Sequence, residues 1–418
     1  MTTVTLSRIR TRLAPLSDRD FRRLLGGRAV SVLGDGLYAV ATMWLVFELT
    51  GSSAYTGLAG ALTQAPGVLA VVTGPLVDRT SLRRALVAAE LLQAAFVIVV
   101  PLAALAGVLS VPVVLATLPL AALGKLLADP AQQAALPRTL DDDQLVRANS
   151  LFSVTRRGVD AAGRAVAGAV VAATGAVAAY GLNALTFLVA AALFGTLGFP
   201  ERERDPDALD LGGYRDEIRA GVAVLRESVL GRMVAASLLA SALLGAAMAA
   251  LPAFAATLGG PTTYGLLLAA ITAGTVAGSV LAPFLDHRPL GRVTVAGFAV
   301  AGTCWTAAVL APGRLPTVAL FAAAQVPVGV YNVSVLATLQ AGVPDDLLGR
   351  VSSTITTCST LVTPLGMLAG GVVADRIGAA TVLLAGGVGT LLMAAYYLAV
   401  PDLRRFGPPA EVTSGQFG

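Results

Sequence analysis

The stretch GPLVDRTSLRR, residues 74–84, joins two apolar segments of the chain, at approximately 56–77 and 85–107. Each segment supplies the roughly 20 apolar residues that a helix needs to cross a hydrocarbon core of about 30 Å. Apolar segments of similar length recur along the chain on both sides of this stretch, for example in Val30–Leu49 and Ala379–Val400. A soluble fold would not contain so many apolar segments of this length. The pattern therefore predicts a helical membrane protein.

Twelve spans are expected, at approximately 24–49, 56–77, 85–107, 112–136, 147–173, 178–199, 230–256, 263–285, 291–311, 315–340, 350–374 and 379–400. The composition agrees, because 56% of the 418 residues are hydrophobic and only 13% are charged, with a mean hydropathy of +0.77. Such values place a chain in the membrane class. The basic residues stand mostly beside spans, so the net charge of +4 reflects topology, and no nucleic-acid partner is expected.

Arginines are concentrated in alternate gaps between the expected spans. These gaps and their flanks contain Arg19, Arg22, Arg23, Arg79, Arg83, Arg84, Arg138, Arg147, Arg202, Arg204, Arg215, Arg219, Arg226, Arg288, Arg292, Arg350, Arg404 and Arg405. The opposite gaps contain only Arg314 and Arg376. The positive-inside rule then predicts a multi-pass protein of the cell membrane, with both termini and the long central loop in the cytoplasm.

The only long polar connection, 200–231, divides the chain into two halves. We expect a six-helix bundle over 1–199, a cytoplasmic linker over 200–229, and a second six-helix bundle with a short tail over 230–418. Apolar residues recur at helical spacing within the linker, which predicts an amphipathic helix along the inner membrane face. They are Tyr214, Ile218, Val222 and Leu225.

The two halves also resemble each other in sequence. LDDDQLVRANS at 140–150 parallels VPDDLLGRVSS at 343–353, an offset of 203 residues. The same offset pairs Gly163 with Gly366 and Gly175 with Gly378. Two parallel repeats related by an axis along the membrane normal are a known transporter architecture. The predicted fold class is therefore an all-α membrane protein with twelve transmembrane helices in two pseudo-symmetric six-helix bundles.

The stretch 74–84 resembles the signature that the major facilitator superfamily carries between its second and third helices. The matching residues are Gly74, Leu76, Asp78, Arg79, Arg83 and Arg84, while Ser81 stands where many members have glycine. LDHRPLGR at 285–292 is a weaker echo in the second half. FRRLLGGRAVSVLGDGL at 21–37 and LVRANSLFSVTR at 145–156 resemble the branch that contains macrolide-efflux proteins and the enterobactin exporter.

This resemblance implies a secondary transporter whose Asp-Arg loop acts as a cytoplasmic latch. Asp78 would accept hydrogen bonds at a helix N-terminus, and the arginines would hold carboxylates or lipid phosphates. The alternative is that these arginines only signal topology. One departure concerns the fifth helix, where antiporters of the family often carry Gly-Pro and this chain has Gly163-Arg164. That departure puts antiport by the usual hinge in doubt.

Ionisable residues inside a membrane are costly and usually functional. Asp35, Lys125, Asp129, Asp160 and Arg164 fall within the expected spans 24–49, 112–136 and 147–173. The family topology implies that these charges converge near the midplane of the first half. Asp129 and Asp160 each have a basic neighbour four residues away on the same helix, which leaves Asp35 without a formal partner.

A carboxyl group in a poorly hydrated site can load and release protons near neutral pH. Asp35 is therefore the first candidate for proton coupling, with Asp129 and Asp160 as further candidates and Lys125 and Arg164 as their charge partners. The alternative is a static paired network that holds the helices together. We expect Glu90 to pair with Arg83 or Arg84 rather than to carry protons.

The candidate residues for a substrate cavity fall into two groups. Two lie on the same helix face as Asp35 in the first half, and the others are neutral polar residues of the second half. The candidates are Tyr38, Thr42, Ser237, Ser241, Gln325, Tyr331 and Asn332. A cavity that is acidic on one wall and apolar or weakly polar on the other suits a cationic amphipathic or bulky lipophilic solute.

The sequence contains no phosphate-binding G-x-x-x-x-G-K-[ST] motif, and its only histidine, His287, lies in an expected loop. We therefore expect no enzyme, no cofactor and no metal site. The predicted function is export of small lipophilic or amphipathic compounds by alternating access, in exchange for protons, by a monomer in the lipid bilayer. The alternatives are uptake or facilitated diffusion of a polar nutrient, or a non-transporting membrane receptor.

Overall fold

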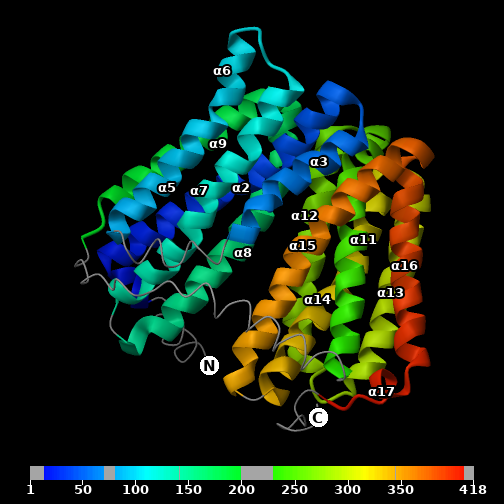
Figure 1. Ribbon diagram of the computed structural model, residues 1–418. Helices are drawn as coiled ribbons and strands as arrows, with labels where there is room; N and C mark the ends of the chain where they lie inside the picture. The colour runs from blue at the N-terminus through cyan, green and yellow to red at the C-terminus, as the bar shows by residue number, and fades with distance from the viewer. Residues whose placement is uncertain (1–13, 70–80, 141, 199–228, 344, 409–418) are drawn as a thin grey trace, which may run out of the picture. The chain divides into compact units, whose positions relative to one another are not determined.

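The computed structural model describes residues 14–69, 81–140, 142–198, 229–343 and 345–408. Within these ranges the chain forms helices and no strands (Figure 1). The long helices are α2 (Arg19–Thr50), α3 (Ser53–Gln64), α5 (Leu82–Val97), α6 (Val99–Leu105), α7 (Val111–Ala135), α8 (Asp142–Thr174), α9 (Ala176–Gly195), α11 (Val229–Leu258), α12 (Pro261–Leu281), α13 (Leu290–Leu310), α14 (Arg314–Gly342), α15 (Asp345–Ile377) and α16 (Ala379–Ala399). Short turns of helix are η1 (Ala14–Ser17), η2 (Ala65–Leu69), η3 (Leu136–Arg138), η4 (Ala282–Phe284) and α17 (Pro401–Arg404).

Ten helices in the described part of the chain are long and apolar enough to cross a membrane. Eleven of the twelve expected spans, and the described part of the span 56–77, coincide with helices, so the prediction of an all-helical membrane protein is confirmed. Two expected spans are not among the ten. The span 56–77 runs into residues outside the described ranges, and the middle of α8 is interrupted by the charged residues Arg156, Arg157, Asp160 and Arg164.

The internal repeat is visible in the backbone at equivalent glycines. Gly175 and Gly378 stand immediately before α9 and α16 with φ of 83° and 92°, a left-handed conformation that glycine adopts without a steric penalty. Gly163 of α8 and Gly366 of α15 each face the backbone of a neighbouring helix. A Cβ on Gly163 would meet the carbonyl of Leu33, and one on Gly366 would meet that of Ala242. The 203-residue offset therefore reproduces both a turn and a close helix contact.

The chain divides into two compact units, Met1–Leu45 with Leu62–Leu209, and Val46–Ala61 with Asp210–Gly418. Residues 46–61 therefore group with the second unit, although the sequence placed them in the bundle 1–199. The reason is a set of direct contacts. Thr56 Oγ1 donates to the carbonyl of Ala249 at 2.6 Å, and the backbone N–H of Ser53 donates to Asp375 Oδ1 at 2.6 Å. The predicted linker helix lies outside the described residues.

In the first unit, α5 runs between α7 and α9, as Figure 1 shows. Its buried core gathers apolar side chains from α2, α5, α7, η3, α8, α9 and the residues just after α9. They are Phe21, Leu24, Leu82, Leu86, Ala131, Ala135, Leu136, Ala148, Phe152, Ala190, Phe194 and Leu197. This packing brings the polar positions of α2, α5 and α7 to one place in the bundle interior.

In the second unit, α16 packs along α11 and α13, and α14 packs along α12 and α13 (Figure 1). The core here contains aromatic side chains, with Phe298, Tyr331 and Tyr397 in mutual ring contact at centroid distances of 4.9–6.3 Å. Ring contacts of this kind add to the burial of apolar area.

Candidate functional site

The first polar contact of the site joins α2 to α7. Lys125 Nζ donates a hydrogen bond to Asp35 Oδ2, and the two side chains are 50% and 20% exposed, respectively. The sequence assigned Lys125 to Asp129 on the same helix and left Asp35 unpaired, and this assignment is wrong. Lys125 reaches across to the neighbouring helix, because α2 brings a carboxylate close to it.

Asp129 instead lies near Arg28, a residue of α2 that sequence reasoning missed. Arg28 Nη1 is 3.8 Å from Asp129 Oδ1 and donates to Gln132 Oε1. The guanidinium also lies over the ring of Phe152, 4.4 Å from its centroid, which is a cation–π geometry. Arg28 is 5% exposed. A signal was available, since Arg28 stands inside an expected span and the reasoning applied to Asp35 applies to it equally.

Glu90 of α5 lies in the same cluster and is fully buried. Its carboxylate accepts hydrogen bonds from Ser31 Oγ at 3.1 and 3.2 Å and from Gln132 Nε2 at 3.4 Å. The expected pairing with Arg83 or Arg84 is therefore wrong. Both arginines are exposed at the start of α5, whereas Glu90 shares the buried face of that helix.

Gln132 is the link between these groups. Its amide oxygen accepts from Arg28 while its amide nitrogen donates to Glu90. Asp35 and Lys125 form the more exposed end of the cluster, and Glu90 with Ser31 forms its fully enclosed end. Buried polar groups are normally hydrogen-bonded, and a network of this kind, in which only Arg28 Nε lacks a partner among the described residues, fixes the rotation of the helices that carry it.

Asp160 and Arg164 form the turn-spaced ion pair that the sequence indicates on α8. Arg164 Nε donates to both carboxylate oxygens, at 3.0 and 3.1 Å, and both side chains are about one-third exposed. The Gly163-Arg164 step also has a packing role, because a Cβ on Gly36 would lie 3.1 Å from the backbone nitrogen of Arg164. Glycines on both helices let α8 approach α2 directly beside Asp35.

Two cavity candidates of the first unit, Tyr38 and Thr42, contact Tyr180 of α9. Thr42 Oγ1 and the hydroxyl of Tyr180 are 2.9 Å apart, and the Tyr38 ring meets the Tyr180 ring edge-on at a centroid distance of 5.2 Å. Thr42 is buried, and the Tyr38 hydroxyl has no hydrogen-bond partner in the described part of the chain. Thr42 thus packs between helices, whereas the Tyr38 hydroxyl can still form a hydrogen bond with another group.

The cavity candidates of the second unit are dispersed over different environments. The hydroxyl of Tyr331 lies 3.2 Å from Ser237 Oγ and 2.8 Å from the hydroxyl of Tyr397, while Ser241 Oγ donates to its own helix at the carbonyl of Ser237. Gln325 is buried where α14 meets α12, since a Cβ on Gly274 would lie 2.9 Å from its Cβ. Asn332 is exposed on α14.

Most of the expected latch cannot be placed. Gly74, Asp78 and Arg79 lie outside the described residues, and only Arg83 and Arg84, both exposed, are seen. Within the described residues, no group of three or more His, Cys, Asp or Glu side chains is arranged to hold a metal ion.

Comparisons with known proteins agree with this architecture. A family model described as MFS_3, transmembrane secretion effector, matches residues 10–413. A solved bacterial homolog of the human lysosomal transporter Spinster, inward-facing and unoccupied, aligns with a TM-score of 0.69 at 13% identity, over 93% of this chain and 98% of that chain. A nucleoside transporter, NupG, aligns with a TM-score of 0.73 at 12% identity, over 91% of this chain and 99% of that one. No curated protein sequence gives a significant match.

Proposed function

Because this multi-pass membrane protein belongs to the transmembrane secretion effectors of the major facilitator superfamily, which are secondary transporters and not enzymes, we propose that it exports small lipophilic or amphipathic compounds in exchange for protons. The observation that carries the proposal is the cluster of ionisable groups inside the first unit. Such groups are costly in a membrane and are retained at ion and proton pathways.

The Asp35–Lys125 pair is the proposed coupling element. Protonation of Asp35 removes its charge, so Lys125 loses its attraction to α2 and the two helices can separate. Release of the proton restores the pair. Neither side chain is fully enclosed by protein, since Lys125 is 50% and Asp35 20% exposed, and a proton needs such an opening to reach the carboxylate. The pair thus links the protonation of one carboxylate to the contact between α2 and α7.

The remaining groups are proposed to support this element. Arg28 holds Asp129 and Gln132, and Gln132 holds Glu90, so a change at the α2–α7 contact reaches α5 through hydrogen bonds. Glu90 receives hydrogen bonds from neutral donors, Ser31 and Gln132, and is a second candidate for holding a proton. The Asp160–Arg164 pair is proposed to stabilise the contact between α8 and α2 rather than to carry protons.

Orientation and latch are part of the same proposal. The distribution of arginines supports cytoplasmic termini, and the exposure of Arg83 and Arg84 leaves them available for carboxylates or lipid phosphates at that surface. Cysteine labelling from one side of the membrane tests the orientation. Labelling of a cysteine placed at residue 84 only from outside the cell would reject it.

The transport test uses everted membrane vesicles that contain the full chain and the lipophilic cation tetraphenylphosphonium as probe. With an acidic interior, the wild type is expected to accumulate the probe, and accumulation should fall when nigericin collapses the pH gradient. Asp35→Asn should lose the gradient-dependent part. Asp20→Asn, which removes another carboxylate of α2 that pairs with Arg23, is the matched control. Equal accumulation with and without the gradient would reject proton coupling.

A further inference from the structure

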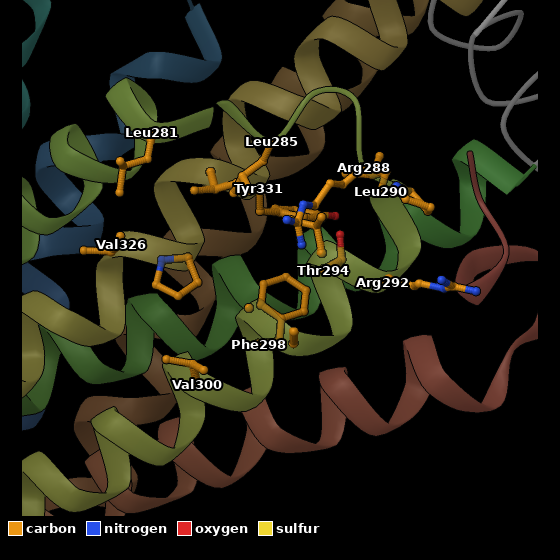
Figure 2. Close-up of a pocket in the computed structure, with 16 residues that line it drawn as sticks. Leu281, Leu285, Arg288, Leu290, Arg292, Thr294, Phe298, Val300, Val326 and Tyr331 are labelled. Carbon is orange, nitrogen blue, oxygen red and sulfur yellow. The ribbon is translucent and has the colours of Figure 1, made fainter. Parts of the chain in front are cut away.

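A cavity of about 570 Å³ lies in the second unit, where α12 and α13 each pack along α14 (Figure 2). Its volume is within the roughly 300–1,000 Å³ typical of sites for small ligands. The walls are mainly aliphatic and come from the end of α12, the loop 285–289, α13 and α14. Leu281 and Val300, which both line the cavity, are 46% and 52% exposed, so its mouth is open and apolar.

One end of this groove, which we call the α12–α13 groove, is cationic. Arg288 precedes α13 and Arg292 lies in its first turn, so both stand at the ends of two membrane-crossing helices. Both arginines line the groove, and Figure 2 shows the Arg288 side chain reaching into it. Within the described residues neither arginine forms an ion pair with a carboxylate. The nearby Asp286 lies 3.7 Å from Nδ1 of its neighbour His287.

Thr294 gives an independent indication that a ligand binds at this end. Its side chain lines the groove and is 3% exposed, yet its hydroxyl has no hydrogen-bond partner in the described part of the chain. Several helical threonines of this unit donate to the carbonyl one turn earlier, as Thr317 does to Gly313 at 2.9 Å, although Thr306 of α13 also lacks a partner among the described residues. In Figure 2 the Thr294 hydroxyl points toward the end of the groove that Arg288 enters. A buried hydroxyl without a partner is costly, and a bound acceptor would remove that cost.

The helix N-terminus itself is not the anion site. The backbone N–H groups of Leu290 and Gly291 donate to the carbonyls of Gly407 and Phe406, at 3.1 and 3.3 Å. Among the described residues at this end of the groove, the side-chain donors without a partner are the guanidinium groups of Arg288 and Arg292 and the hydroxyl of Thr294. An anionic group would be held by side chains.

We propose that the α12–α13 groove binds a phospholipid with an anionic headgroup. One acyl chain occupies the aliphatic part of the groove, and the phosphate accepts hydrogen bonds from Arg288 and Thr294 while Arg292 adds positive potential. Charge complementarity identifies this occupant, because basic pockets between membrane helices at headgroup level bind anionic lipids. The aliphatic mouth favours a lipid over a free phosphate compound.

Tyr331 connects the groove to the interior of the second unit. It lines the groove, and its hydroxyl lies within hydrogen-bonding distance of Ser237 on α11 and Tyr397 on α16. A bound lipid would therefore contact a residue that ties three helices together.

The test measures retention of phosphatidylglycerol and of phosphatidylcholine with the same acyl chains on the purified full-length protein, by native mass spectrometry. The wild type should retain phosphatidylglycerol preferentially. Arg288→Gln and Thr294→Val should each weaken this retention about fivefold. Arg314→Gln is the matched control, since Arg314 is an exposed arginine at the start of α14 and does not line the groove.

Equal retention of the two lipids by the wild type would overturn the proposal. So would unchanged preference in Arg288→Gln and Thr294→Val, or an equal loss in Arg314→Gln, which would assign the preference to surface charge in general. Glycerol phosphate, which lacks acyl chains, should not compete. Competition at the affinity of the whole lipid would overturn the assignment to a phospholipid.

Discussion

Replacing Asp375 with alanine is expected to loosen the beginning of α3. The Asp375 carboxylate, at the end of α15, accepts hydrogen bonds from the backbone N–H of Ser53 at 2.6 Å and of Ala54 at 3.2 Å, and from the hydroxyl of Ser52. The first N–H groups of a helix have no partner within the helix, so an acceptor from elsewhere stabilises that end.

The magnitude follows from these contacts. Loss of a side chain that caps a helix N-terminus costs about 0.5–2 kcal/mol. The N–H of Ser53, whose residue is 2% exposed, also loses its partner, but Asp375 is exposed and water can replace part of the interaction. We therefore expect about 1–2 kcal/mol, which corresponds to a roughly 5- to 30-fold change in the local opening equilibrium.

Amide hydrogen exchange of the purified protein measures this opening directly. Amides 53–56 should exchange about 5- to 30-fold faster in Asp375→Ala than in the wild type. Asp402→Ala is the control, since it removes a carboxylate that pairs with Arg232 where both side chains are about half exposed. Unchanged exchange at 53–56 in Asp375→Ala, or the same acceleration in Asp402→Ala, would refute the reasoning.

Two further predictions concern packing and charge. Gly57→Ala should lower the free energy of unfolding by about 1–3 kcal/mol, because its new Cβ would collide with the carbonyl oxygen of Met367, while Gly181→Ala, which meets nothing within 4 Å, should not destabilise the protein. Thermal unfolding of both variants checks this, and equal transitions would contradict it. A double-mutant cycle with Asp35→Asn and Lys125→Met should give a coupling energy of only about 0.5–1 kcal/mol, because Lys125 is half exposed. A coupling of several kcal/mol would instead indicate a static structural pair.

The boundaries of the helices could be read from the sequence because they depend on local properties. Apolar length and alternating arginines predicted most of the described membrane-spanning helices to within about five residues, and the 203-residue repeat paired Gly175 with Gly378, which the structure places at equivalent turns. Burial of one face of α5 was also readable. Leu82, Leu86 and Ala89 repeat at helical spacing on the face that contains Glu90.

The partners of the charged groups could not be read in the same way. Spacing along one helix relates Lys125 to Asp129, but the partner that Lys125 takes is set by the rotation of α7 against α2. Likewise, Arg28 reaches Asp129 only because two helices lie side by side. Sequence spacing identifies which charges are buried, whereas the contacts between helices decide which charges meet.

Proton release on binding is the most direct test of the central claim, that a carboxylate of the first unit exchanges its proton for substrate. Tetraphenylphosphonium is added to the purified wild type in weakly buffered solution, a pH-sensitive dye reports released protons, and calorimetry measures binding. We predict proton release on binding in the wild type and its loss in Asp35→Asn. Binding by the wild type without proton release would contradict the account.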